Sequence, residues 1–266
     1  MSLDRDYSPS TRVADLRVHL EEYERRSRAA RAAGYRPLRY GPRPEQVADH
    51  FPGGSPDAPL MVYVHGGYWQ ELGREDSAFA AADFRREGMA FAALGYGLAP
   101  RYRLDEIVAM VREGVRWLAA RAHGPVHLSG SSAGAHLVAM ALLDGPPVAG
   151  AALLSGVYEL GELRRTYVNA ALGLDAAAAA RNSPLRRLPD RLPPLVVAVG
   201  DNETAAFTRQ HHDFVAAARP RTPELVSFIA RGRNHFDLPL DLGRRGTPLG
   251  DAVLAQMRSR GSSQRS

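Results

Sequence analysis

Apolar positions recur along the chain in two patterns, and each pattern predicts a different kind of element. Short continuous apolar runs are typical of strands that a sheet buries on both faces. Such runs occupy residues 59–64, 89–96, 125–128, 148–154, 195–199 and 225–229. Two less apolar segments, 35–40 and 46–51, lie on either side of a Gly-Pro turn and are expected to be edge strands.

Apolar residues spaced three or four positions apart predict helices between these strands. This spacing occurs at 12–33, 77–86, 104–120, 135–143, 204–218 and about 248–257. Residues 157–192 lack a strand pattern and contain a run of alanines, so we expect a helical, cap-like insertion there. Buried strands that alternate with helices predict one α/β domain over residues 1–266, with a mostly parallel sheet and right-handed crossovers. The polar stretch 258–266 is expected to be a flexible tail.

Composition narrows the classes of function. The chain contains no cysteine, which excludes disulfides, thiolate metal ligands and a cysteine nucleophile. Its first residues do not resemble a signal peptide and no apolar run could span a bilayer, so we expect a cytoplasmic protein that does not bind a membrane. The net charge is +5 with arginine as the basic residue throughout, but the arginines are scattered and often adjoin acids. This distribution argues against a nucleic-acid partner.

One stretch combines a strand, a sharp turn and the start of a helix. Gly130, Ser132 and Gly134 form the pattern G-x-S-x-G, which marks a nucleophile elbow when a strand precedes it and a helix follows. Small residues are needed on both sides of the serine because the turn is strained and the neighbouring backbone is close. Both flanking elements are predicted here, so we expect Ser132 to be a catalytic nucleophile.

A serine hydroxyl becomes a good nucleophile only with a histidine base, which in turn needs a carboxylate to orient it. In elbow-containing folds the chain order is serine, acid, histidine, with each residue following a strand. Asp201 and His235 follow the last two predicted strands, which completes a predicted triad of Ser132, Asp201 and His235. Glu203 is the alternative acid. We prefer Asp201 because it directly follows the predicted strand end, although it could also cap the next helix.

The loop after the strand at 59–64 is the second half of the predicted site. Its glycines allow backbone N–H groups to approach an oxyanion, and we expect the donors to be Gly67, Tyr68 and, after the nucleophile, Ala133. Tyr68 and Trp69 are either core aromatics or a wall for an aromatic substrate, and we predict the second role. Ser131 is expected to face the substrate as well. No histidine and carboxylate group has the spacing of metal ligands.

Several motifs resemble the kynurenine formamidases (arylformamidases) of the α/β-hydrolase superfamily, which are related to hormone-sensitive-lipase-like esterases. The similar segments include His65-Gly66-Gly67-Tyr68-Trp69, Tyr96-Gly97-Leu98-Ala99-Pro100, Ser155-Gly156-Val157-Tyr158, Asn182-Ser183-Pro184-Leu185, Gly200-Asp201-Asn202-Glu203 and Asn234-His235-Phe236. The resemblance implies an α/β-hydrolase fold and hydrolysis of the N-formyl amide of N-formyl-kynurenine without a metal or cofactor. Ser131 and Ala135 depart from the family, which usually has histidine and glycine at these positions.

Three functions remain open from the sequence. The first is an arylformamidase that acts on a small aromatic substrate. The second is a carboxylesterase, or a biosynthetic acyl hydrolase or transferase, that uses the same residues on another substrate. The third is a ligand-binding protein without catalysis, which the complete set of candidate residues disfavours. The sequence is compatible with a homodimer and does not identify the oligomeric state.

Overall fold

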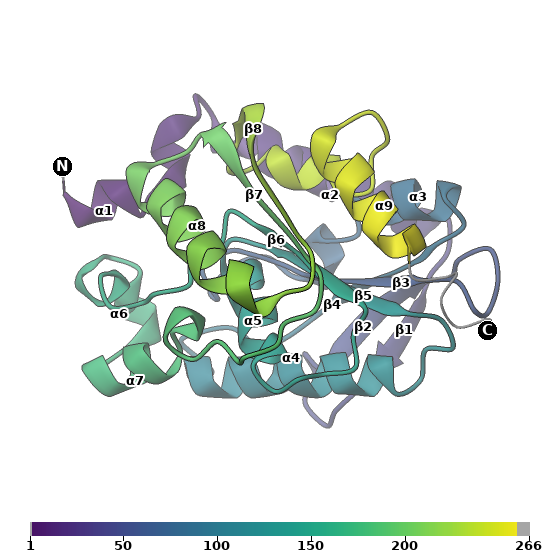
Figure 1. Ribbon diagram of the computed structural model, residues 1–266, viewed down its shortest axis with the longest axis horizontal. Coiled ribbons are helices and arrows are strands. Elements are labelled where there is room, and N and C mark those ends of the chain that lie inside the picture. The colour runs from purple at the N-terminus through teal and green to yellow at the C-terminus, as the bar shows by residue number, and fades with distance from the viewer. Residues whose placement is uncertain (1, 260–266) are drawn as a thin grey trace.

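Eight strands form one sheet in the computed structural model, which describes residues 2–259 (Figure 1). Their order is β1-β2-β4-β3-β5-β6-β7-β8. β2 runs antiparallel to both of its neighbours, whereas β4, β3, β5, β6, β7 and β8 are mutually parallel. The strands are β1 (Arg36–Arg39), β2 (Val47–Phe51), β3 (Leu60–Val64), β4 (Ala90–Leu94), β5 (Val126–Ser131), β6 (Gly150–Leu154), β7 (Leu195–Asn202) and β8 (Leu225–Asn234). The predicted mostly parallel sheet is confirmed.

Helices cover both faces of the sheet: α4, α5 and α8 pack on one face, and α2, α3 and α9 on the other (Figure 1). The α-helices are α1 (Leu3–Asp6), α2 (Leu16–Ala32), α3 (Ala81–Arg86), α4 (Leu104–Ala119), α5 (Ala133–Leu142), α6 (Asn169–Leu172), α7 (Ala176–Arg181), α8 (Ala205–Ala218) and α9 (Pro248–Ser259). Short 3₁₀ helices occupy Pro9–Arg12, Arg74–Asp76, Leu163–Arg165, Pro184–Arg186, Arg219–Arg221 and Leu238–Asp241. The helices at Leu3–Asp6 and Pro9–Arg12 were not predicted.

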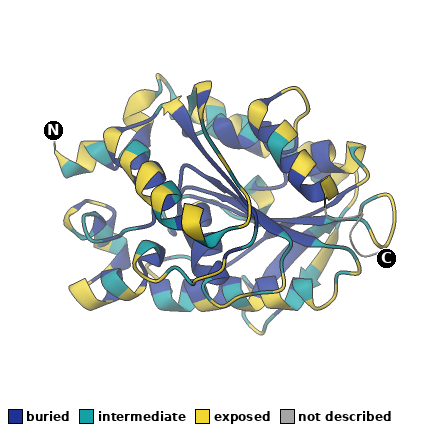
Figure 2. Ribbon diagram, in the orientation of Figure 1, coloured by how far each residue is buried: buried dark blue, intermediate teal, exposed yellow. Residues whose placement is uncertain are grey.

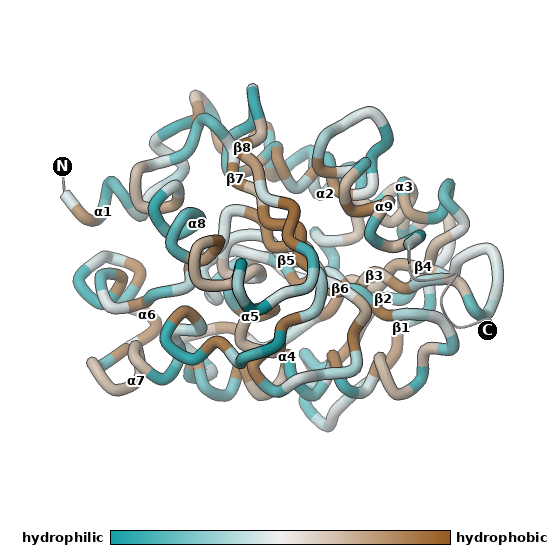
Figure 3. Tube along the Cα trace, in the orientation of Figure 1, coloured by the Kyte–Doolittle hydropathy of each residue, from teal (hydrophilic) through white to brown (hydrophobic). Residues whose placement is uncertain are grey.

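The strands separate two hydrophobic cores because successive side chains of a strand point to opposite faces. In β3, Leu60, Val62 and Val64 belong to the core under α4, α5 and α8, whereas Met61 and Tyr63 belong to the other core. The central strands are therefore buried and apolar on both sides, and the outward faces of the helices carry the exposed residues (Figures 2 and 3). This arrangement explains the continuous apolar runs in the sequence.

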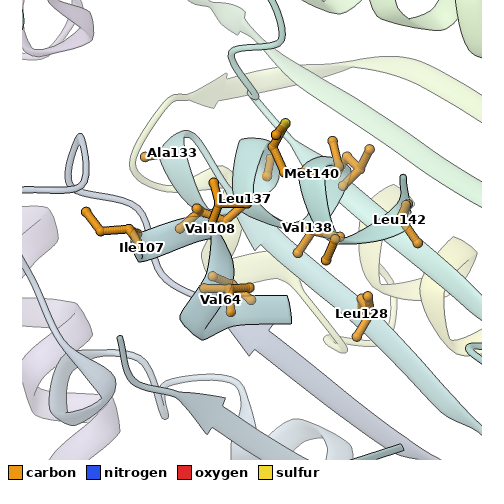
Figure 4. Close-up of a cluster of buried hydrophobic side chains, with 14 of the residues drawn as sticks. Val64, Ile107, Val108, Leu128, Ala133, Leu137, Val138, Met140 and Leu142 are labelled. Carbon is orange, nitrogen blue, oxygen red and sulfur yellow. The ribbon is translucent and has the colours of Figure 1, made fainter. Parts of the chain in front are cut away.

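Helix α5 is buried along its whole length, which gives the turn before it a rigid support. All ten of its residues are buried. Figure 4 shows Leu137, Val138 and Met140 of this helix close to Leu128 of β5 and Val108 of α4. Each fully buried side chain of this size contributes about 1.5–3 kcal/mol to folding before the entropy cost is counted. Helix α5, which follows Ser132, is thus held between β5 and α4.

The segment 157–192 contains short helices, and a hydrogen bond from one buried histidine connects it to α5. His136 donates from Nε2 to the carbonyl of Asn182 at 2.7 Å, and burial lowers the pKa of His136 to about 4, which keeps the ring neutral. Asn182 in turn donates to the carboxylate of Asp105 on α4 at 2.8 Å.

The last helix extends further along the chain than the sequence predicts. Arg258 and Ser259 belong to α9, so the tail predicted from residue 258 is wrong for these two, and 260–266 lie outside the described residues. Within residues 2–259, no helix is both long enough and apolar enough to cross a membrane.

Candidate active site

Ser132 lies at a sharp turn between β5 and α5, as the elbow motif predicts. Its φ of 55° and ψ of −121° belong to a strained conformation, and its backbone N–H donates to the carbonyl of Leu154 at 2.8 Å. A Cβ at Gly134 would collide with the carbonyl oxygen of Val64, and one at Gly130 would collide with the backbone of Gly134. The two glycines therefore allow the turn, and Ser132 borders a pocket while remaining largely buried.

The loop after β3 lies directly against this turn. A Cβ on Gly66 would come within 3.0 Å of the Ser131 carbonyl oxygen and 3.3 Å of the Ser132 Cβ. The loop bends through positive φ at Gly67 (87°) and Tyr68 (49°), and both residues line the same pocket as Ser132. No described residue accepts a hydrogen bond from the backbone N–H of Gly67, Tyr68 or Ala133. The three predicted donors are thus available to a substrate oxygen.

A stacked pair supports the start of the loop. The ring of His65 lies 4.0 Å from that of Tyr96 at an angle of 11°, and the Tyr96 hydroxyl donates to the His65 carbonyl at 2.8 Å. Burial lowers the pKa of His65 to about 4. The ring of His65 is therefore neutral at physiological pH, and its contacts with Tyr96 support the loop.

Trp69 does not line the pocket, so the prediction that it forms a wall for the substrate is wrong. Its side chain is fully buried and packs edge-on against His136, with ring centroids 4.9 Å apart. Its backbone carbonyl accepts from the N–H of Ala99 at 2.8 Å. Positive φ values at both Tyr68 and Trp69 turn the two neighbouring aromatics in different directions, and only Tyr68 reaches the pocket.

His235 follows β8 and borders the pocket, but its partner is Glu203. Both carboxylate oxygens of Glu203 lie 3.0 Å from His235 Nδ1, and the Glu203 side chain has no exposed surface. Burying a carboxylate costs free energy unless it is paired, so the hydrogen bond from His235 stabilises Glu203 in this position. Because Nδ1 donates to Glu203, the other ring nitrogen is the one left to act as a base.

The predicted pairing of Asp201 with His235 is wrong, because the carboxylate bonded to His235 is that of Glu203. Its side chain is exposed and accepts from the backbone N–H of Gly232 at 2.9 Å. The reason is that β7 does not end before Asp201: it continues through Asn202, and its register with β8 is irregular between Gly200 and Asn202. The first residue of the loop is therefore Glu203, which the sequence offered as the alternative.

The pocket shared by Ser132 and His235 has a volume of about 280 Å³. Three tyrosines and a phenylalanine contribute to its wall, and they come from four separate parts of the chain. Its lining residues are Pro9, Ser10, Leu16, Leu20, Tyr23, Gly66, Gly67, Tyr68, Gln70, Glu71, Leu72, Ser131, Ser132, Tyr167, Val168, His235 and Phe236. The lining combines aromatic and aliphatic groups with few charges, which suits an aromatic ligand.

Ser131 reaches the pocket, as predicted. Its Oγ accepts from the hydroxyl of the buried Tyr63 at 3.1 Å. A hydroxyl that accepts one hydrogen bond keeps its own proton for donation. Ser131 can therefore donate to a polar group of a ligand beside Ser132.

The N-terminal part of the chain is the portion of the site that the sequence did not reveal. Pro9, Ser10, Leu16, Leu20 and Tyr23 form one side of the pocket. The helical spacing of the last three predicted a helix, but nothing in a single sequence says that this helix would pack at the carboxyl ends of the strands. Among residues 2–259, no group of three or more histidine and carboxylate side chains could hold a metal ion.

Comparison with known proteins gives independent support for the predicted fold and the predicted family resemblance. A family model described as BD-FAE matches residues 51–146, which include both the loop after β3 and Ser132. The chain is 38% identical over 175 residues to the kynurenine formamidase of Salmo salar, and the match covers 60% of this chain and 60% of that relative. The matched part is thus less than two thirds of the relative's length. The kynurenine formamidase of Drosophila melanogaster is 29% identical over 273 positions, which cover 89% of this chain and 90% of that protein.

The solved structures include one from Silicibacter sp. TM1040, described as a candidate thioesterase, that is similar over nearly the whole chain. It has 28% sequence identity and a TM-score of 0.87, and the match covers 96% of this chain and 99% of that one. These comparisons confirm the predicted α/β-hydrolase fold and the predicted resemblance to the kynurenine formamidases.

Proposed function

Because the chain has the α/β-hydrolase fold and resembles the kynurenine formamidases, we propose that it is a serine hydrolase that cleaves the N-formyl amide of N-formyl-kynurenine or a related N-formyl aryl amine. One observation carries the proposal. Ser132, in a strained elbow, and His235, paired with a buried glutamate, line one pocket together with the loop of Gly67 and Tyr68.

In the proposed reaction, Ser132 Oγ attacks the formyl carbon while His235 Nε2 takes its proton. The N–H groups of Gly67, Tyr68 and Ala133 stabilise the oxyanion that forms. The C–N bond then breaks, and the imidazolium gives its proton to the departing aryl amine. His235 next activates a water molecule, which hydrolyses the formyl ester on Ser132 and releases formate. Glu203 keeps the His235 ring oriented throughout and stabilises its charged form.

The lining of the pocket supports an aryl group in the substrate. Tyr68, Tyr167 and Phe236 offer aromatic surface, and the aliphatic side chains Leu72 and Val168 lie among them. Binding energy on the aryl side can be used to orient the carbonyl on Ser132. A formyl group is the smallest acyl group, so an enzyme adapted to it gains nothing from longer acyl chains.

The proposal is tested with an acyl series on one aryl amine. We expect kcat/KM to be highest for the N-formyl compound and to fall by about 10-fold or more for the N-acetyl and N-butyryl homologues, since a short acyl site excludes added carbons. Ser132→Ala, measured beside the wild type, gives the background. Its rate should be lower by at least about 10³-fold, because the nucleophile is lost.

The same series identifies the alternative. A rate that rises with acyl length, together with good turnover of p-nitrophenyl esters, would replace the formamidase by a carboxylesterase. No turnover of amides or esters by a folded wild-type protein would instead favour a ligand-binding role.

A further inference from the structure

The N-terminal segment, residues 3–12, contacts the two loops that carry the proposed oxyanion donors and the proposed acid. We propose that this segment positions both loops for the reaction: Tyr7 holds the oxyanion loop through Tyr68, and Asp6 holds the acid loop through Thr204. The inference rests on the proposed function because it assigns positioning roles to residues that contact the proposed oxyanion and acid loops.

Tyr68 is fixed through its side chain. Its hydroxyl donates to the backbone carbonyl of Tyr7 at 2.5 Å, while its backbone N–H is one of the proposed oxyanion donors. A positive φ on a residue with a side chain costs about 1–2 kcal/mol, so the bend at Tyr68 needs contacts outside the loop to hold it. The hydrogen bond to Tyr7 supplies such a contact.

Tyr7 is itself held firmly enough to serve as an anchor. Its side chain is fully buried, and its hydroxyl donates to Glu162 at 3.0 Å and accepts from Gln210 Nε2 at 3.2 Å. The side-chain oxygen of Gln210 accepts in turn from the backbone N–H of Tyr158 at 2.8 Å. Tyr7 therefore connects the oxyanion loop to α8 and to the segment that follows β6.

The same segment reaches the acid. The hydroxyl of Thr204, the residue after Glu203, donates to the carbonyl of Asp6 at 2.5 Å. Phe207 lies between the N-terminal segment and the proposed base. Its ring packs edge-on against Tyr7 at 6.3 Å and against His235 at 4.6 Å. The loops after β3 and β7 are far apart in the sequence, and the N-terminal segment binds both of them: Tyr7 accepts from Tyr68, and Asp6 accepts from Thr204 beside Glu203.

Tyr68→Phe tests the first connection by removing only a hydroxyl. We expect kcat to fall by about 10-fold with KM changed less than twofold, because a misaligned oxyanion donor affects the transition state more than substrate binding. Tyr40→Phe is the matched control, since its buried hydroxyl donates to the Gly95 carbonyl, also at 2.5 Å, and Tyr40 does not line the pocket. The two variants should lose similar stability, but only Tyr68→Phe should lose kcat.

Thr204→Val and Thr204→Ser test the second connection. Valine has the shape of threonine without the hydroxyl, and serine keeps the hydroxyl. We expect Thr204→Val to lower kcat by about 10-fold and Thr204→Ser to retain most of it, since a misaligned Glu203 orients His235 poorly. An unchanged kcat in Thr204→Val, or a loss in Thr204→Ser alone, would mean that the hydrogen bond to Asp6 does not position the acid loop.

The rate of covalent labelling of Ser132 by a fluorophosphonate is measured for every variant, because labelling needs no knowledge of the natural substrate. A wild-type protein that is not labelled at Ser132 overturns the proposed function itself. A labelled wild type with the same labelling rate and kcat in Tyr68→Phe as in Tyr40→Phe overturns only the positioning role. A change in KM alone for Tyr68→Phe would also overturn it, since it would make Tyr68 a simple substrate contact.

Discussion

The turn after β5 and the turn after β7 both carry a candidate catalytic residue beyond a parallel strand, but they are built differently. After β5 the chain turns at once: Ser132 has a φ of 55°, and α5 begins with the next residue. After β7 the change is gradual. The strand continues through Asn202 with an irregular register, Glu203 follows it, and α8 begins only at Ala205.

The causes of the two geometries differ in their distance along the chain. The turn at Ser132 depends on Gly130 and Gly134, which lie within two residues of it and remove collisions with nearby backbone. The end of β7 depends on its pairing with β8, where Asn202 lies opposite Asn234. A residue placed by steric limits close in sequence can be identified from a motif, whereas a residue placed by strand pairing cannot.

The largest expected effect concerns the second turn. Glu203→Gln should lower kcat by about 10³-fold or more, because an amide cannot orient and stabilise the charged imidazole as a carboxylate does. Asp201→Asn should retain kcat within about threefold. Among residues 2–259, the exposed Asp201 side chain bonds only to the Gly232 N–H, from which an amide oxygen can also accept. The measurement is kcat on the best substrate of the acyl series, with folding checked by circular dichroism.

The opposite ranking of these two variants would mean that the loop after β7 rearranges during catalysis to bring Asp201 to His235. Equal, small effects in both would mean that His235 acts without a carboxylate partner.

Much of the fold could be predicted because its signals are local. Continuous apolar runs identified the parallel strands, and the elbow motif identified Ser132. The acid was misassigned because apolar periodicity stops at Val199, although hydrogen bonding between β7 and β8 continues to Asn202. Trp69 was misassigned for a similar reason: the loop turns it into the core, where it packs against His136 of α5, a residue distant in the sequence.

Gly134→Ala tests the first turn and should affect stability more than any other small change there. Its new Cβ would collide with the carbonyl oxygens of Val64 and His65, which are held in and just after β3. We expect a loss of about 3 kcal/mol in the free energy of unfolding, because backbone on both sides must move. Gly54→Ala is the control, since its nearest atoms would be 3.6 Å away. Urea denaturation gives both values, and a stable Gly134→Ala would show that the turn tolerates larger residues.

A smaller effect is expected for pH, and it involves the helix that follows Ser132. Burial lowers the pKa of His136 to about 4, whereas an unfolded histidine titrates near 6.5. Between these values the unfolded chain binds the proton and the folded chain does not, so stability present above pH 6.5 is lost as the pH falls. For one such residue the loss from pH 7 to pH 5 is about 2 kcal/mol.

His136→Gln should remove this part of the acid sensitivity, because glutamine does not titrate and its amide can still donate to the Asn182 carbonyl. The free energy of unfolding, measured in urea at pH 7 and pH 5, should therefore fall by about 2 kcal/mol less in His136→Gln than in the wild type. His123→Gln is the control, since His123 is exposed and changes its surroundings little on unfolding. If all three proteins lose stability equally, the acid sensitivity arises elsewhere, with the buried ring of His65 as the next residue to replace.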